Sequence, residues 1–365
     1  MLRCAVILSC CAATFAAGPL KNVIVYKEAG KFGGWPANHG IWSWGNEIVA
    51  GFELGDFKLN PRGHAIDYAK PAGHVLARSL DGGETWRIER PEGLRPPPNR
   101  KVAGVPTGTG GREPVEFTGS MNFTAAGFAF TARMEDIHVG PSRFYYSTDK
   151  GKCWNGPFRL PDFGQKGTAA RTDYLVNGER DALIFLTAAK SNGREGRVFC
   201  ARTRDGGKTW QFVSFIGPEP EGDDFAIMPS SLRLPGGAIL TAIRHRRWIE
   251  LFRSDDDGRR WRAMDRPAPD TGGGNPPHMI RLRDGRLAMT YGYRSKPFGI
   301  RARLSRDDGE TWSEEIMLRT DGGGSDLGYP RTAERPDGKL VTVYYFNDDA
   351  QRERYIGGTI WDPGK

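Results

Sequence analysis

The sequence contains little cysteine and no long apolar segment beyond its first residues. Only 5 of its 365 residues are cysteine, and three of these lie at positions 4, 10 and 11. The other two, Cys153 and Cys200, are compatible either with one disulfide bond or with two separate buried thiols. No stretch after residue 17 is apolar over the roughly 20 residues that a membrane-spanning helix needs. A stable membrane span is therefore not expected.

Runs of a single charge and helical periodicity are also missing. The formal net charge is +8, but Lys and Arg are scattered among Asp and Glu, so nucleic acid is not expected as a partner. An anionic small ligand or an acidic glycan remains compatible with this charge. No segment repeats apolar residues at helical spacing. The 49 Gly, 25 Pro and 11% aromatic residues instead indicate many short strands joined by tight turns.

The first 17 residues have the features of a signal peptide. Arg3 supplies a positive charge, an apolar segment runs from Cys4 to Phe15, and Ala16 and Ala17 fit a cleavage site. Export to the periplasm or the extracellular space is therefore expected, with residues 18–365 forming one domain. A lipid anchor on Cys10 is less favoured, because the apolar run before it is short.

One octapeptide pattern occurs five times. It reads Ser/Thr-x-Asp-x-Gly-x-Thr-Trp and lies at residues 79–86, 147–154, 203–210, 254–261 and 305–312, with Cys153 and Arg260 in place of Thr. The starts are 68, 56, 51 and 51 residues apart. In such a turn the Asp accepts hydrogen bonds from nearby backbone N–H groups, the Gly supplies a positive φ, and the Trp anchors the next strand. A repeat of about 50 residues is typical of a propeller or a solenoid.

A second repeat lies between the octapeptides. Met228-Pro229, Pro276-Pro277 and Tyr329-Pro330 each open a strand that is followed by a Gly-containing hairpin and an apolar strand. The last unit, ending with residues 355–361, lacks a fourth strand, and the strand expected at residues 22–26 has no neighbour in sequence. Pairing these two segments would close a ring without an open edge. We therefore predict an all-β fold: a six-bladed β-propeller of four-stranded antiparallel blades, closed by the N-terminal strand.

The octapeptides resemble the Asp boxes of the sialidase superfamily, and the resemblance covers nearly all of residues 18–365. It implies that the boxes are scaffold at the blade periphery. Enzymes of that family bind a substrate carboxylate with three Arg, and they use a Tyr nucleophile activated by a Glu and an Asp acid/base. A Tyr nucleophile avoids the repulsion that a carboxylate would meet at an anionic sugar.

Candidate site residues follow from the propeller and from this resemblance, because the starts of the inner strands converge on the axis. The stretch Gly328-Tyr329-Pro330 matches the place of the nucleophile, and the loop before the first box suggests Asp67 as the acid/base. His39 is the third catalytic candidate. The substrate-binding candidates are Arg171, Asp173, Arg244, His278, Arg294, Arg301 and Arg331. Arg244 matches the second family Arg, and Arg294 fits the third better than Arg301.

Two positions depart from the family pattern. The first Arg is absent from Asn38-His39-Gly40-Ile41, and Met228 stands where the activating Glu is expected. The expected function is that of an exported exo-sialidase-type glycoside hydrolase acting on a terminal acidic sugar. A uronate lyase, with His39 or Tyr329 removing a proton, and a non-catalytic glycan-binding propeller are the alternatives. No metal or cofactor is expected, and a monomer is expected.

Overall fold

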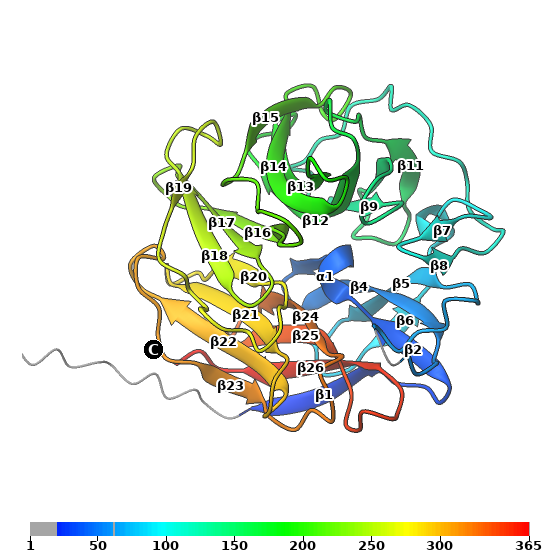
Figure 1. Ribbon diagram of the computed structural model, residues 1–365, viewed down its shortest axis with the longest axis vertical. Helices are drawn as coiled ribbons and strands as arrows, with labels where there is room; N and C mark the ends of the chain where they lie inside the picture. Colours follow the sequence, from blue (N-terminus) through cyan, green and yellow to red (C-terminus); the bar gives the residue numbers. More distant parts are fainter. Residues whose placement is uncertain (1–19, 61–62, 365) are drawn as a thin grey trace, which may run out of the picture.

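The computed structural model describes residues 20–60 and 63–364. The predicted signal peptide, residues 1–17, lies outside the described residues. Six antiparallel sheets surround a central axis, and the short helix α1 (Pro36–His39) lies near the centre of the ring (Figure 1). The predicted six-bladed β-propeller is confirmed.

The blades follow one another in chain order. The first contains β2 (Lys31–Gly34), β3 (Ile41–Trp44), β4 (Glu47–Asp56), β5 (Gly73–Ser79) and β6 (Arg87–Glu89), the second β9 (Ala129–Met134), β10 (Ser142–Ser147) and β11 (Asn155–Arg159), and the third β12 (Thr168–Val176), β13 (Ala182–Ala189), β14 (Glu195–Thr203) and β15 (Gln211–Phe215). The fourth contains β16 (Ile227–Arg233), β17 (Ile239–Arg244), β18 (Ile249–Ser254) and β19 (Arg262–Ala263), the fifth β20 (His278–Arg281), β21 (Leu287–Tyr293), β22 (Gly299–Ser305) and β23 (Ile316–Arg319), and the sixth β24 (Gly328–Glu334), β25 (Leu340–Phe346), β26 (Tyr355–Trp361) and β1 (Lys21–Tyr26).

The N-terminal strand closes the ring as predicted. Strand β1 pairs antiparallel with β26, with Asn22 opposite Thr359 and Val23 opposite Gly358. The first and last described strands therefore share one blade, and separating them would expose the edge of β26. This arrangement removes an open sheet edge and makes the ring dependent on a non-local contact.

The second blade differs from the others. Its sheet has three strands within the described residues, with β9 at the inner edge. An isolated parallel bridge between Val115 and Phe158 adds a contact at its outer edge. The long connection from the first blade carries the 3-10 helix η1 (Glu92–Leu94) and a hairpin of β7 (Lys101–Val102) and β8 (Val105–Pro106). Helix α1 packs against strands of the first, second, third and sixth blades.

The five Asp boxes have one hydrogen-bond pattern, and each box lies between the last two strands of one of the first five blades. In each box the Ser or Thr hydroxyl donates to the Asp carboxylate at 2.7–2.9 Å. The same hydroxyl accepts the Gly N–H at 2.7–2.9 Å. In four boxes the Trp indole N–H also donates to the Gly carbonyl, whereas in the third box the buried indole N–H of Trp210 has no partner among residues 20–60 and 63–364. The boxes thus fasten the turn between these two strands in each blade.

Apolar faces of neighbouring blades pack together to form the core. Between the fifth and sixth blades, for example, Trp361 and Tyr344 pack in one buried cluster with Leu304. Burying each such side chain contributes on the order of 1.5–3 kcal/mol. Both cysteines are free thiols, Cys153 exposed and Cys200 buried, so the disulfide alternative does not hold. Among the described residues no helix is long and apolar enough to span a membrane.

Candidate active site

The inner strands of the fourth and sixth blades begin at one end of the axis. Because neighbouring strands are antiparallel, the start of an inner strand pairs with the end of the next strand. Gly328 at the start of β24 lies opposite Tyr345, and Ile227 at the start of β16 lies opposite Arg244. We refer to this end of the axis as the Tyr329 end.

Tyr329 has an unusual backbone conformation. Its φ is 53°, and Met228, at the equivalent second position of β16, has a φ of 54°. Both residues lie at irregularities in strand pairing. Positive φ is uncommon for residues other than glycine and costs energy that the surroundings must supply. The Asn275 side chain holds the sixth-blade segment, accepting the N–H of Tyr329 at 2.9 Å and donating to the Leu327 carbonyl at 3.0 Å.

Two arginines without an acidic partner flank Tyr329. Arg244 Nη1 donates to the Tyr329 hydroxyl at 3.0 Å. The Arg294 guanidinium carbon lies 5.5 Å from the centre of the Tyr329 ring, and its Nη2 donates to the Tyr345 hydroxyl at 2.7 Å. Within the part of the chain that the structure describes, neither Arg244 nor Arg294 forms an ion pair. No carboxylate of the described residues therefore contacts either guanidinium group directly, although Arg294 also donates to the Leu327 carbonyl.

A third arginine acts on Tyr329 from the third blade. Arg171 is buried and forms an ion pair with Glu195, whose Oε2 lies 3.2 Å from Arg171 Nη2. Burial by itself would raise the pKa of Tyr329, but the positive charges of Arg244, Arg294 and Arg171 outweigh burial and lower this pKa below its ordinary value. The Tyr329 hydroxyl is thus easier to deprotonate than an ordinary phenol.

A histidine held by a carboxylate lies beside Tyr329. His64, in the loop after β4, has its Nδ1 2.6 Å from Asp326 Oδ1, and its ring centre is 6.1 Å from that of Tyr329. Asp326 also accepts the Tyr345 hydroxyl at 2.9 Å and Arg354 Nε at 3.0 Å. Despite burial, His64, Arg354 and the Ala65 N–H together hold the pKa of Asp326 well below its usual range. Because an ionised carboxylate only accepts, Nδ1 of His64 carries the hydrogen and Nε2 remains for other chemistry.

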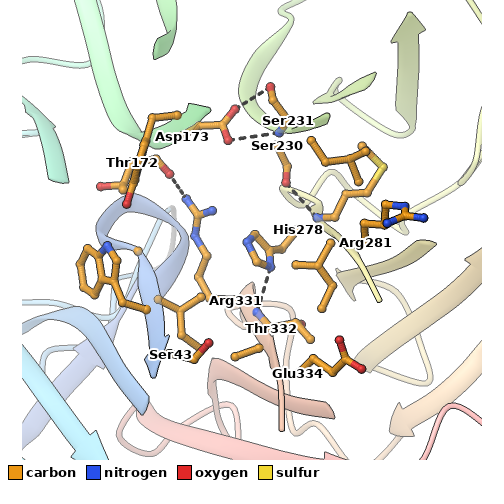
Figure 2. A pocket seen from close by; sticks show the side chains of 18 of the residues that line it. Ser43, Thr172, Asp173, Ser230, Ser231, His278, Arg281, Arg331, Thr332 and Glu334 are labelled. Atoms are coloured by element: carbon orange, nitrogen blue, oxygen red, sulfur yellow. Dashed lines mark hydrogen bonds between the residues drawn. The ribbon is translucent and has the colours of Figure 1, made fainter. Parts of the chain in front are cut away.

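Asp173, His278 and Arg331 do not lie at the Tyr329 end. They line a pocket toward the other end of the inner strands (Figure 2). Arg331 Nη2 donates to the carbonyls of Ala37 and Thr172, so it joins the sixth blade to the first and third. The predicted substrate-binding set is therefore divided between two ends of the axis.

His39 belongs to a separate buried cluster. Its Nε2 lies 3.5 Å from Glu53 Oε2, and the same oxygen is 2.9 Å from His74 Nδ1. Burial and the nearby positive charge of Arg133 lower the pKa of His39 well below its usual value. No hydrogen bond between His39 and Tyr329 exists among the described residues. The expectation that His39 shares a pocket with Tyr329 and takes its proton is therefore not supported by these contacts.

Two further candidates have partners elsewhere. Arg301 forms an ion pair with Glu315 and lies 3.6 Å from the ring centre of Tyr293, so Arg294 and not Arg301 joins the Tyr329 cluster. Asp67 lies 3.6 Å from Lys58 Nζ and accepts the N–H of Ala69 at 3.0 Å. The same loop also carries His64, whose ring lies beside the ring of Tyr329.

A family comparison agrees with this architecture. The model of the BNR repeat-like domain matches residues 126–342, which is more than half of the chain. The chain belongs to the BNR repeat-like domain family. The sequence-based recognition of the sialidase superfamily is thus confirmed. No relative among curated proteins matches the sequence.

Solved structures of the same fold come from proteins with different functions. A Dyadobacter fermentans protein of unknown function is 22% identical, with a TM-score of 0.70 over 94% of this chain and 99% of that chain. Penicillium chrysogenum α-L-arabinanase, complexed with arabinobiose, is 16% identical, with a TM-score of 0.59 over 95% and 99%. Trypanosoma rangeli sialidase, in complex with sialic acid, is 11% identical, with a TM-score of 0.59 over 94% and 59%. At these identities the likeness shows the fold alone.

Sequence reasoning missed the groups that complete the Tyr329 cluster in this BNR-family chain. His64 lies in the loop that suggested Asp67, and Asp326 lies three residues before Tyr329. Asn275 directly precedes the Pro pair of the fifth blade. Asn275 and Asp326 lie a few residues before β20 and β24 in the sequence. Polar residues in the loops before the inner strands were therefore the signal that could have identified them.

Proposed function

We propose that the protein cleaves the glycosidic bond of a terminal acidic sugar, with Tyr329 as the reacting group. The observation that carries this proposal is a buried tyrosine with a lowered pKa beside Arg244 and Arg294, which form no ion pair with any residue that the structure describes. Guanidinium groups bind carboxylates through paired hydrogen bonds. A substrate carboxylate bound there would place the neighbouring anomeric carbon close to the Tyr329 oxygen.

Activation of Tyr329 relies on positive charge in this proposal. Met228 occupies the place of the family Glu, and its sulfur lies 3.5 Å from Arg244 Nη1. A thioether cannot take a proton from tyrosine. The arginines instead stabilise the phenolate, whose oxygen attacks the anomeric carbon while the bond to the leaving oxygen breaks. Water then displaces Tyr329 from the sugar, and the phenolate is restored.

His64 is the group that supplies the proton for the leaving oxygen. The Asp326 contact at Nδ1 orients the ring and leaves Nε2 as the atom that would carry the transferred proton. This role replaces the acid function that the family resemblance suggested for Asp67. After cleavage the neutral His64 accepts a proton from the incoming water.

A uronate lyase is the second candidate, and the lowered pKa of Tyr329 supports it as well. Here Tyr329 would remove the proton alpha to the carboxylate, the glycosidic oxygen would leave, and an unsaturated uronate would form. Product analysis separates the two, because elimination produces a conjugated product that absorbs ultraviolet light and hydrolysis does not.

The test is a screen of sialylated and uronate-containing oligosaccharides with the wild-type protein and with Tyr329→Phe. Release of a saturated acidic monosaccharide by the wild type alone supports the hydrolase. Release of an unsaturated product would instead support the uronate lyase. Equal turnover by both proteins would refute a reacting role for Tyr329, and binding without turnover by either would support the glycan-binding alternative. Export is proposed from residues 1–17, and cell fractionation with and without that segment tests it.

A further inference from the structure

The propeller has a polar pocket that is distinct from the Tyr329 cluster. The pocket is about 630 Å³ and includes Glu334 at the far end of β24. Tyr329 and Glu334 are five positions apart, or about 16 Å along an extended strand. Because the inner strands run from one end of the axis to the other, the pocket opens at the end opposite Tyr329. Its volume falls in the range typical of small-molecule sites.

Three ionisable groups meet in this pocket from three different blades. Asp173 comes from β12, His278 from β20 and Arg331 from β24 (Figure 2). All three are more than nine-tenths buried. Such groups need partners, and an incompletely satisfied one indicates a place where a ligand or water binds.

Each of the three has hydrogen-bonding capacity left. Asp173 accepts the Ser231 N–H at 3.1 Å and the Ser231 hydroxyl at 2.8 Å, whereas a carboxylate offers about four acceptor positions. Thr332 N–H donates to His278 Nδ1 at 2.9 Å, so the ring hydrogen is on Nε2. Arg331 uses Nη2 for the Ala37 and Thr172 carbonyls, and among the described residues no group accepts from its Nη1 or Nε.

The pocket therefore presents two kinds of polar group. His278 and Arg331 offer donors, and Arg331 carries a full positive charge. Asp173 offers acceptor oxygens, and in its ionised form it would repel a ligand with several negative charges. A ligand that satisfies both the donors and the acceptors has a single acidic group and also hydroxyl groups that donate hydrogen bonds.

The remaining lining matches a sugar ring. Trp42, Ile41 and Met279 supply apolar surface beside the polar groups. Arg281 lies at the pocket as a further cation, while Arg283 is already paired with Glu334. A saccharide presents C–H faces as well as hydroxyls, so mixed walls of this kind suit it better than they suit a bare inorganic anion.

We propose that this pocket is a second site that binds a monosaccharide acid, independently of Tyr329. The sugar carboxylate contacts Arg331 and His278, and ring hydroxyls donate to Asp173. This inference does not rest on the proposed function, because it concerns binding at the opposite end of the axis and needs no turnover.

Isothermal titration calorimetry with D-glucuronate tests the proposal. D-glucose, which has the same ring without the carboxylate, and inorganic phosphate, which has charge without ring hydroxyls, serve as comparison probes. The titrations use wild-type protein and Arg244→Ala, in which the anion-binding group at the Tyr329 end is removed. We expect saturable glucuronate binding in both proteins, with affinity at the pocket unchanged within about twofold, and at least tenfold weaker binding of either comparison probe.

Two variants address the pocket itself. His278→Asn keeps an acceptor near the Nδ1 position but removes the Nε2 donor. Ser43→Trp places a large ring at the exposed rim of the pocket without changing the three ionisable groups, and Leu80→Trp is its control at an exposed position of the first box. We expect His278→Asn and Ser43→Trp to weaken glucuronate binding at least tenfold and Leu80→Trp to leave it unchanged.

Several results would overturn the proposal. These are the absence of saturable glucuronate binding, phosphate binding as tight as glucuronate binding, or full binding by Ser43→Trp. Loss of all binding in Arg244→Ala would assign the sugar acid to the Tyr329 end alone. Absence of turnover in the glycan screen would contradict the proposed function but not this site, so the two failures are distinguishable.

Discussion

Arg244→Met is the substitution that tests the electrostatic activation of Tyr329 most sharply. It removes a positive charge and the 3.0 Å hydrogen bond to the Tyr329 hydroxyl while keeping an unbranched side chain. Two unit charges about 4 Å apart interact by about 4 kcal/mol at an effective dielectric constant near 20, and a hydrogen bond to a charged group contributes about 1.5–3 kcal/mol. We therefore expect deprotonation of Tyr329 to become less favourable by about 2–4 kcal/mol.

The sign of this effect follows from which form the arginine stabilises. Arg244 favours the phenolate, so its loss raises the pKa of Tyr329. At neutral pH the ionised fraction falls by roughly 30- to 1000-fold, given about 1.4 kcal/mol for each factor of ten. If the phenolate reacts, turnover falls in proportion, and the rising limb of the pH–rate profile moves to higher pH.

The assay is a spectrophotometric titration of tyrosine ionisation. Subtracting the curve of the corresponding Tyr329→Phe protein isolates Tyr329 from the other tyrosines. Arg246→Met is the control, since Arg246 is an exposed arginine of the same blade that pairs with Asp224 rather than Tyr329. Identical Tyr329 titrations in the wild type and Arg244→Met would refute the electrostatic account.

Three further predictions concern other parts of the molecule. His64→Ala should lower turnover on the acidic glycan at least tenfold with substrate affinity retained, measured by steady-state kinetics, whereas an unchanged kcat would exclude it as the acid. Burial raises the pKa of Asp173 to about 7. Between about pH 4 and 7 the folded state therefore binds more protons than the unfolded state. As pH rises across that window, Asp173 lowers the free energy of unfolding by up to about 4 kcal/mol. Denaturant titrations of Asp173→Asn should lack that decline, and an unchanged decline would contradict it. Asp307→Ala removes the acceptor of the Ser305 and Thr311 groups and should cost about 2–3 kcal/mol of stability, with kcat unaltered; a loss of kcat in folded protein would oppose a scaffold role for the boxes.

Repetition made the fold predictable. The five boxes fix the turn between two strands in each of five blades, so the strands on either side could be placed by counting from them. The missing fourth strand after residues 355–361 predicted the pairing with β1, which the register of Asn22 and Thr359 confirms. The reduced sheet of the second blade was not predictable, because its box follows the common pattern apart from Cys153 and says nothing about the number of strands.

The candidate site was only partly predictable. Equivalent blade positions brought Tyr329, Arg244 and Arg294 together, since antiparallel pairing places strand starts and the ends of their neighbours at one end. The convergence of strand starts did not separate the two ends of the axis. Arg331, two residues after Tyr329 along β24, therefore lines the opposite pocket instead of the Tyr329 cluster. His39 was misplaced for another reason, because α1 turns the chain there and directs it to Glu53, which no local pattern indicated.

The central claim is that Tyr329 reacts with an acidic sugar held by arginines. Its most direct test is a comparison of binding and turnover in Tyr329→Phe and the wild type, on an acidic glycan that the wild type cleaves. The substitution leaves the guanidinium groups of Arg244 and Arg294 in place, so we expect glycan affinity within about threefold of wild type and no detectable turnover. Wild-type turnover by Tyr329→Phe would contradict the account.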